Sequence, residues 1–220
     1  MLVLPPDRGS AFCGVPESSL KFPNHDWKYS YQTLERRAIR ASLGLDIGCG
    51  SGEKTVIHAR FADALVGGDL DTRALKQAST KGIMTVRFDA HALPFRKGAF
   101  DLVMCFHTIE HLASPSLFLE EVRRGMAEGS MLIIITPNRQ RATSLLNRML
   151  RFIHRNADAF PMNPLHVHEF DLGELKRVAS ACFEDYYVQP IGLRIWRFDV
   201  EFLPRILWKV GDQLAAICRT

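Results

Sequence analysis

Three glycines and an acid form the most chemically informative stretch of this sequence. Asp46 closes a short apolar run, and Gly48, Gly50 and Gly52 follow it at every second position. Glycine permits positive φ and leaves room for a ligand to approach the backbone, where a Cβ would block it. Residues 53–57 then have the composition of a helix start. Together these features predict a pocket of backbone N–H groups for a nucleotide or a carboxylate, with an ordinary tight turn as the alternative.

Alternating apolar and amphipathic segments must position these residues. Strands are expected at 43–47, 64–69, 84–88, 100–106, 131–136 and 185–190, with a last one over 193–200. Helices are expected at 33–42, 53–61, 73–81, 116–126 and 171–182. Strands that alternate with helices predict an α/β fold, here a doubly wound, mostly parallel seven-stranded sheet. The nearly pure Ile/Leu composition of 131–136 is typical of a strand that is covered on both faces.

The glycine stretch resembles motif I of the class I S-adenosylmethionine-dependent methyltransferases, and the later acids stand where that family has them. In the family, the glycine loop lies beneath the methionine end and the ribose of the cofactor. The resemblance implies that Asp46 helps to hold the cofactor's amino group, often through water, and that Asp69 binds the ribose hydroxyls. One carboxylate can accept hydrogen bonds from two neighbouring hydroxyls. Leu70 is then expected to lie against the adenine.

Segment 88–95 resembles the family's adenine-edge segment, with Phe-Asp-Ala followed by Leu-Pro-Phe. This resemblance implies that Asp89 accepts a hydrogen bond from the exocyclic amine of adenine and that the Ala90 backbone lies near the ring. The similarity runs from about residue 43 to residue 138, and its nearest branch is that of ubiquinone and menaquinone biosynthesis with its small-molecule relatives. Each acid alone could be an ordinary surface carboxylate. Four motifs in the expected order favour the methyltransferase family.

A nicotinamide-dependent enzyme is the nearest competing class. Its fingerprint is G-x-G-x-x-G, whereas the sequence here reads G-x-G-x-G and has Glu53 at the place of the third fingerprint glycine. That class also leaves Asp89 unexplained. A dehydrogenase is therefore a weak alternative.

Residues 107–111, His-Thr-Ile-Glu-His, match the inverted zinc-peptidase signature H-x-x-E-H. Zinc-peptidase chemistry needs both histidines on one helix face, with the glutamate as the base. Here the motif directly follows an apolar strand, and Ser114-Pro115 comes just beyond it. We therefore expect no metal site.

His107 is the candidate catalytic residue. It follows the fourth predicted strand, where the family places the loop over the cofactor's sulfur, and neutral imidazole suits proton transfer near pH 7. A structural histidine is the alternative. His166 and His168, ahead of the penultimate helix, are weaker candidates for the same pocket.

Two further segments carry hypotheses about the acceptor. Residues 139–165 form an insertion that is expected to build a substrate lid, with an apolar helical face opposite several arginines. Residues 201–220 have helical apolar spacing and are expected to form a C-terminal amphipathic helix. Basic amphipathic helices can lie on anionic membranes, although both segments could equally pack on the sheet domain.

Composition narrows the other classes. The 220 residues suit one large domain over 43–220, preceded by an arm and a helix over 1–42. The net charge of +4 is too small to indicate nucleic-acid binding. Five scattered cysteines without a Cys-x-x-Cys pair suggest a reducing, cytoplasmic setting, with a peripheral membrane contact left open. The initial apolar run ends at Pro5-Pro6, well short of a signal peptide.

The sequence therefore predicts an enzyme that uses S-adenosyl-L-methionine to methylate a small-molecule or lipid-linked acceptor. The alternatives are a protein that binds the cofactor without catalysis and, less favoured, a methyltransferase that acts on protein or nucleic acid. The sequence leaves open which acceptor atom is methylated and which oligomeric state the protein has.

Overall fold

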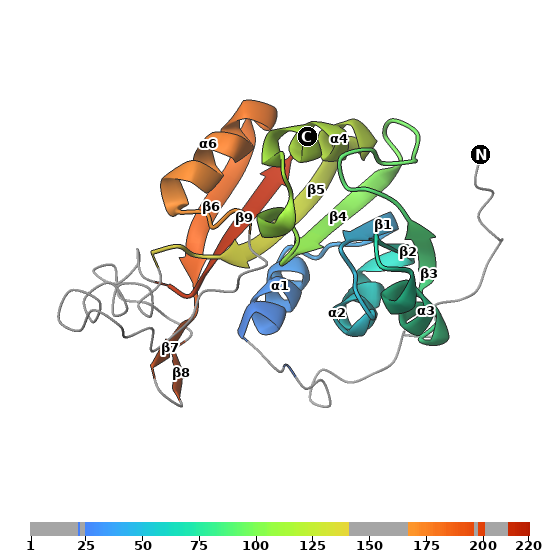
Figure 1. The fold of residues 1–220 in the computed structure, drawn as a ribbon, viewed down its shortest axis with the longest axis horizontal. Helices are drawn as coiled ribbons and strands as arrows, with labels where there is room; N and C mark the ends of the chain where they lie inside the picture. The colour runs from blue at the N-terminus through green and yellow to red at the C-terminus, as the bar shows by residue number, and fades with distance from the viewer. Residues whose placement is uncertain (1–21, 23–24, 141–166, 196–197, 201–210) are drawn as a thin grey trace.

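The computed structural model describes residues 22, 25–140, 167–195, 198–200 and 211–220. The fold is a mixed seven-stranded sheet with helices on both faces (Figure 1). The strands of this sheet are β1 (Ala41–Ile47), β2 (Ala62–Asp69), β3 (Met84–Arg87), β4 (Phe100–Phe106), β5 (Met126–Pro137), β6 (Asp185–Ile191) and β9 (Gln213–Arg219). Their order is β3-β2-β1-β4-β5-β9-β6. All neighbours are parallel except β9, which is antiparallel to both β5 and β6. The predicted doubly wound sheet is thereby confirmed.

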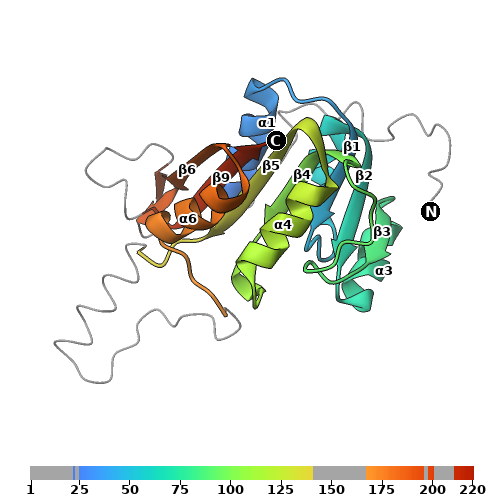
Figure 2. The same cartoon turned by 90° about the horizontal axis from the view of Figure 1, so that it is seen from above.

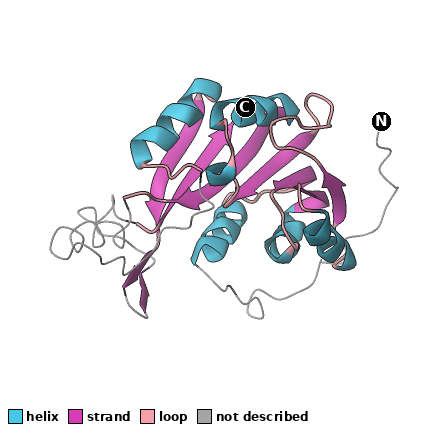
Figure 3. Ribbon diagram, in the orientation of Figure 1, coloured by secondary structure: helices cyan, strands magenta, loops and turns pink. Residues whose placement is uncertain are grey.

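The helices form two layers, which Figure 3 shows in cyan on either side of the magenta strands and Figure 2 shows from above. Helices α1 (His25–Arg36), α2 (Glu53–His58) and α3 (Thr72–Thr80) lie on one side, and α4 (Pro115–Gly125) and α6 (Leu172–Cys182) on the other. Two single turns of 3-10 helix, η2 (Ala59–Phe61) and η3 (Ile109–His111), follow α2 and β4.

Three of the described helices, α3, α4 and α6, begin at a residue whose side chain caps them. The Asp71 carboxylate accepts a hydrogen bond from the backbone N–H of Arg73 at the start of α3. Ser114 caps α4, and Pro115 stands at the first helical position, where its missing N–H costs nothing. In α6, Asp171 and Glu174 form a reciprocal capping box.

Alternate residues of the central strands fill two separate cores. In β5, Leu132 and Ile134 pack into the core beneath α4 and α6, together with Phe118 and Leu175. Their neighbours Ile133 and Ile135 pack into the core beneath α1 and η2, which includes Tyr31, Leu34 and Phe61. Because β5 is buried on both faces, it reads as a continuous apolar run.

Three sequence-based assignments need correction. The helix expected over 33–42 is instead α1 at 25–36, and β1 already begins at Ala41, so the proposed domain boundary at 42/43 falls inside a strand. The strand expected over 193–200 is a separate two-stranded hairpin of β7 (Leu193–Ile195) and β8 (Phe198–Val200).

The third correction concerns the C-terminal amphipathic helix expected over 201–220. Residues 201–210 lie outside the described residues, but 213–219 form strand β9. The strand is covered on both faces, so Leu214 to Cys218 are all buried. A short apolar run of this kind satisfies helical spacing and strand burial equally well.

Candidate functional site

The order of the strands reverses between β1 and β4. From β1 the chain builds outward through β2 and β3, and then returns to place β4 on the other side of β1. In open α/β sheets, ligands bind beyond the carboxyl ends of the strands at such a switch point. The loop after β1 begins at Gly48 and the loop after β4 begins at His107, so both predicted segments meet at this place.

The glycine loop has the left-handed conformations that its sequence predicts. Gly48, Gly50 and Gly52 have φ values of 75°, 54° and 85°. The N–H groups of Gly48 and Cys49 both donate to the Gly68 carbonyl, at 2.8 and 3.0 Å, which fastens the loop to β2. No atom lies within 4 Å of the position that a Cβ on Gly50 would take. The loop backbone is therefore open on one side at Gly50.

Asp69 is tied to the glycine loop. Its Oδ2 accepts a hydrogen bond from the Gly50 N–H at 2.9 Å, and its Oδ1 accepts one from the Asp71 N–H at 2.9 Å. Carboxylate oxygens can each accept more than one hydrogen bond. The side chain is thus fixed by two backbone donors and keeps the capacity to accept from a ligand.

Asp46 is buried at the end of β1, with 2% of its surface exposed. Its Oδ2 accepts a hydrogen bond from the Thr55 hydroxyl at 2.6 Å. Burial raises the pKa of Asp46 to about 6, because the charged carboxylate has lost water, and the hydrogen bond from Thr55 opposes this only in part.

Asp89 lies at the surface beyond β3 and is held by His91. Its Oδ1 accepts a hydrogen bond from the His91 backbone N–H and lies 2.8 Å from His91 Nδ1. These hydrogen bonds lower the pKa of Asp89. His91 Nε2 in turn accepts a hydrogen bond from the Ser114 N–H at 3.2 Å, so this histidine connects the loop after β3 to the start of α4.

Two adjoining cavities open on either side of the glycine loop, and Gly48 and His107 line both of them. The first has a volume of about 270 Å³, and its walls include Asp69, Leu70 and Ala90. The second has a volume of about 250 Å³, and its walls include Asp46, Gly50 and Lys54. The structure thus brings every predicted site residue except Gly52 and Asp89 into the lining of one or both cavities. Gly52 instead packs against Ile83, whose Cδ1 would lie 2.4 Å from a Cβ at this position.

Leu70 is one of the few large apolar side chains that the structure exposes, with 56% of its surface accessible. It lies in the wall of the first cavity beside Phe88. An exposed leucine at a cavity mouth can make an apolar contact with a ligand.

His107 occupies a strained position at the end of β4. Its φ is 55°, which is uncommon for a residue with a Cβ, and its backbone N–H donates to the Ile135 carbonyl at 2.8 Å. Backbone strain of this kind persists where the surrounding structure fixes the residue, and it is frequent at functional sites. The imidazole lies between two acids, Asp26 and Glu110, at 3.2 and 3.4 Å.

The sequence did not point to several polar residues around His107. Asp26 from α1, Lys54 from α2 and Gln213 from β9 all approach the imidazole or its partners. The Lys54 ammonium also lies 4.6 Å from the Phe106 ring centre and 5.3 Å from that of Trp27. Among these residues, only Glu110 has a sequence signal: it stands inside the H-x-x-E-H segment and in a segment, 110–112, that resembles the family's sequel to the fourth strand.

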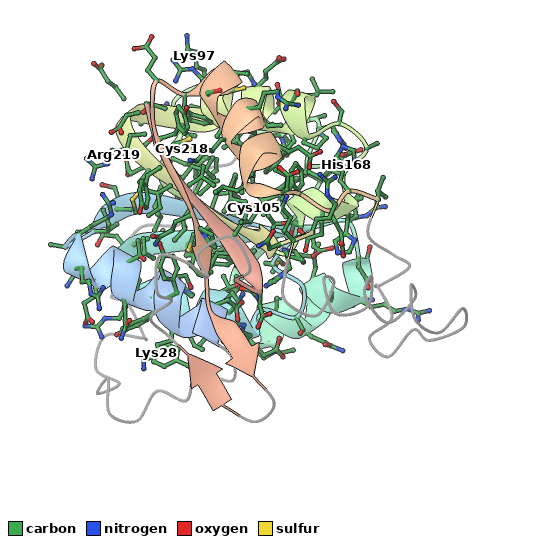
Figure 4. All side chains as sticks on the ribbon, turned by 90° about the vertical axis from the view of Figure 1, so that its left-hand side faces the viewer. Lys28, Lys97, Cys105, His168, Cys218 and Arg219 are labelled. Atoms are coloured by element: carbon green, nitrogen blue, oxygen red, sulfur yellow. The ribbon has the colours of Figure 1, made fainter. Side chains whose placement is uncertain are left out.

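The structure describes one of the two other histidine candidates. His168 is exposed and lines neither of the two cavities, and His166 lies outside the described residues. The H-x-x-E-H segment forms a strand end and one 3-10 turn, not a helix. In the described part of the chain, no three His, Cys, Asp or Glu side chains are grouped to hold a metal ion. Cys105 and Cys218 are buried in the sheet, with Cys105 near the middle of the view in Figure 4.

The described residues on either side of the predicted lid insertion lie side by side. Asn138 and Phe170 form an isolated parallel bridge, and the Arg139 N–H donates to the Phe170 carbonyl at 2.8 Å. The His168 N–H donates to the Glu110 carbonyl, also at 2.8 Å. The insertion therefore leaves the sheet and returns to it next to the turn that carries Glu110.

Comparison with known proteins gives the class. Residues 45–134 match the profile of a methyltransferase-domain family. A probable S-adenosylmethionine-dependent methyltransferase of Mycolicibacterium smegmatis is 28% identical over 174 residues, which are 78% of this chain and 62% of the relative. A ubiquinone biosynthesis O-methyltransferase of Parvibaculum lavamentivorans is 33% identical over 115 residues, 48% of this chain and 46% of the relative.

Among solved structures, a SAM-dependent methyltransferase of Thermotoga maritima, described as a possible histamine N-methyltransferase, aligns with a TM-score of 0.64. Its sequence is 17% identical, and the match covers 88% of each chain, so this likeness concerns the fold. The fold and the matches are similar to those of the class I S-adenosylmethionine-dependent methyltransferases, a family whose cofactor is S-adenosylmethionine. The chain spans 46–62% of the length of the two curated relatives.

Proposed function

We propose that this protein transfers a methyl group from S-adenosylmethionine to a small-molecule or lipid-linked acceptor. The observation that carries the proposal is the meeting of the glycine loop, Asp69 and two adjoining cavities at the switch point of the sheet. The cofactor's sulfonium activates its methyl group for in-line displacement. The protein must therefore bind the cofactor and the acceptor, align the acceptor with the methyl group and exclude water.

The residues of the first cavity suit the adenosine part of the cofactor. Asp69 would accept from the ribose hydroxyls while the Gly50 and Asp71 N–H groups hold it in place. Leu70 would cover one face of the adenine, and Ala90 would lie at its edge. Asp89 would accept from the exocyclic amine, held by its contacts with His91.

The residues of the second cavity suit the amino-acid end. Asp46 would bind the ammonium group, whose positive charge would favour the ionised carboxylate. Gly48, Gly50 and Gly52 would shape the loop beneath the ligand, and the open side of Gly50 would let it approach the backbone. His107, which lines both cavities, would contact the acceptor.

The nature of the acceptor rests on weaker support. The relative and the solved structure described above carry names of an O- and an N-methyltransferase. The chain that follows the insertion that would form a lid over the acceptor bonds through the His168 N–H to the Glu110 carbonyl. The lipid hypothesis rests on the basic, apolar sequence pattern of residues 139–155, most of which lies outside the described residues. None of the described helices is both long enough and apolar enough to span a bilayer.

Two experiments test the proposal. Calorimetry with S-adenosylmethionine should show binding at a single site, and labelled methyl should then pass from the cofactor into one product of a metabolite extract. Binding without transfer to metabolite, protein or nucleic-acid fractions would favour a cofactor-binding protein without catalysis. Absence of binding would refute the proposal.

The hypothesis of a lipid-linked acceptor has a test of its own, co-sedimentation of the protein with anionic liposomes at low salt. If the protein does not bind the liposomes, the lipid-linked acceptor is ruled out.

A further inference from the structure

The His107 imidazole lies between two buried carboxylates. Nε2 lies 3.2 Å from Asp26 Oδ2, and Nδ1 lies 3.4 Å from Glu110 Oε1. The exposed fractions of the two acids are 1% and 0%. Both ring nitrogens therefore face an acid that has almost no contact with water.

Asp26 is shared by two cations. Its Oδ2 accepts a hydrogen bond from the Lys54 ammonium at 2.6 Å and also contacts His107 Nε2. Its Oδ1 is buried without a hydrogen-bond partner. Burial alone would raise the pKa of Asp26. The hydrogen bonds and charges of His107 and Lys54 outweigh burial and hold that pKa well below its usual range.

Glu110 has a similar arrangement on the other side. Its Oε2 accepts a hydrogen bond from the Thr136 hydroxyl at 3.0 Å, and its Oε1 has no hydrogen-bond partner, because 3.4 Å to Nδ1 is a long ion-pair contact. An ionised carboxylate only accepts, so each nitrogen that faces one is best satisfied when it carries a proton. The site therefore favours the imidazolium.

The other groups around the ring act in opposite directions. Lys54, on α2, brings a positive charge that disfavours the imidazolium, while burial disfavours any charge. Gln213, on β9, is neutral and has its Nε2 3.4 Å from His107 Nε2. Asp46, at the end of β1, lines the second cavity with His107, and His111 lines the first. The balance raises the pKa of His107 above its ordinary value, because the hydrogen bonds to Asp26 and Glu110 outweigh burial and Lys54.

We propose that Asp26 and Glu110 are positioning residues, which hold the His107 imidazole from its two nitrogens and, with Lys54, set the pH above which Nε2 takes a proton from the methyl acceptor. The proposal rests on the proposed function in one respect: a methyl acceptor supplies that proton.

The proton balance explains why this pH matters. When an acceptor oxygen or nitrogen that bears hydrogen gains a methyl group, its O–H or N–H bond breaks and the electron pair stays on the acceptor atom. The released proton goes to His107 Nε2, which must have lost its own proton to solvent beforehand. Nδ1 faces the fully buried Glu110 and Nε2 faces Asp26, which is 1% exposed. The proposal assigns the proton to Nε2 and requires the acceptor to take the place of Asp26 at this nitrogen.

The first test needs no acceptor. The pKa of His107 is measured by NMR of the ¹⁵N-labelled imidazole in the full-length protein and in four variants. In the unchanged protein we expect titration above 6.5, the ordinary value. Asp26→Asn should lower the pKa by about 1 unit, because the ring loses an anion while the Lys54 ammonium remains. Glu110→Gln should also lower it. Lys54→Gln should raise it, and the exposed control Asp63→Asn should leave it unchanged.

Opposite shifts in the Asp26 and Lys54 variants cannot arise from general loosening of the fold. Glu110→Gln gives a second variant in which the pKa should fall, so the comparison with Lys54→Gln remains possible if Asp26→Asn folds poorly. An unchanged pKa in both Asp26→Asn and Glu110→Gln would overturn the positioning role.

The second test measures the initial rate of labelled-methyl transfer into a metabolite extract between pH 6 and pH 9. We expect the rate to rise with pH, with a midpoint above pH 6.5. In Asp26→Asn this midpoint should move to lower pH, as the pKa measured by NMR does. If the NMR value moves and the midpoint does not, the proton-accepting role of Nε2 is wrong. If the NMR values behave as expected but no methyl is transferred, the proposed function fails while the positioning of His107 stands.

Discussion

Gly48 lies so close to Thr108 that a Cβ built on the glycine would come 1.9 Å from Thr108 Oγ1. The same hydroxyl lies 3.2 Å from the Ile47 carbonyl and 3.3 Å from the Phe106 carbonyl, so it bridges the ends of β1 and β4. Glycine at position 48 is therefore required by packing as well as by its φ of 75°. The close approach joins the two loops that line both cavities.

Gly48→Ala should be strongly destabilising for this reason. The added methyl must displace Thr108 from its bridge, and the left-handed backbone adds strain, so we expect a loss of about 2–4 kcal/mol in the free energy of unfolding. Gly129→Ala is the matched control. Its φ is 71°, but no atom lies within 4 Å of the new Cβ, so only the backbone strain of about 1 kcal/mol remains. Denaturant unfolding of both variants checks the difference, and equal losses would show that the Thr108 contact is unimportant.

Asp69→Asn should weaken cofactor binding. An asparagine side chain has one acceptor oxygen where the carboxylate has two, so it cannot serve the Gly50 and Asp71 N–H groups and a ribose together. Loss of a hydrogen bond to a charged group corresponds to about a ten- to hundredfold rise in Kd by calorimetry. Asp63→Asn makes the same chemical change at an exposed position of the same strand. A similar Kd in the two variants would argue against Asp69 as a cofactor ligand.

His107→Ala should lower turnover far more than it lowers affinity for S-adenosylmethionine. The side chain lines both cavities, but it follows β4, whereas Asp69 and the glycine loop, which are expected to hold the cofactor, belong to β2 and to the loop after β1. The relevant measurements are the rate of labelled-methyl transfer and, separately, the Kd of the cofactor. Equal loss of both, or loss of neither, would remove His107 from contact with the acceptor.

The buried His58 should make folding sensitive to acid. Its Nδ1 lies 2.8 Å from the Lys54 carbonyl and its Nε2 lies 2.9 Å from the Ser30 hydroxyl, so the neutral ring is satisfied without a second proton. Burial lowers the pKa of His58 to about 4. The unfolded chain therefore binds a proton that the native protein does not, and stability falls as the pH drops from about 6.5 to about 4.

His58→Gln isolates this contribution, because Asp46 acts in the opposite direction. The raised pKa of Asp46, about 6, means that the native protein gains stability as the pH falls through 6 toward 3.8. Since Asp46 is present in both proteins, the stability gap between wild type and His58→Gln should narrow by on the order of 2–3 kcal/mol between pH 7.5 and pH 4.5. Urea unfolding at the two pH values measures the gap. A constant gap would mean that His58 does not titrate differently on unfolding.

Much of the fold could be predicted because the strand segments are long, apolar and separated by clear turn signals. The segment 100–106 matches β4 residue for residue, and the starts of β2 and β5 differ by two to five residues from expectation. The errors occur where one-dimensional patterns are ambiguous. Leu214 and Ile217 are spaced as on a helix, yet they belong to a strand buried on both faces. Helix α1 begins at His25, although the sequence predicts a helix only from residue 33, and Tyr31 and Leu34 form its buried face.

The residues of the candidate site also differ in whether the sequence predicts them. Gly48, Gly50, Asp46 and Asp69 could be found because the loop and the strand ends are local features of the sequence. Asp26 and Gln213 could not, because they meet His107 only through the packing of α1 and the antiparallel insertion of β9. A single sequence contains no signal for contacts between segments 81 and 106 residues apart.

The position of β9 has a consequence for synthesis of the chain. Among the strands that the structure describes, β6 pairs with the sheet through β9 alone, and β9 is made after it. When residues 185–191 emerge from the ribosome, they have no strand to pair with, and the edge of β5 that later pairs with β9 is also unpaired. Both edges remain open to wrong partners until residues 213–219 are released and close the gap. Completion of the sheet thus depends on the late arrival of one seven-residue strand.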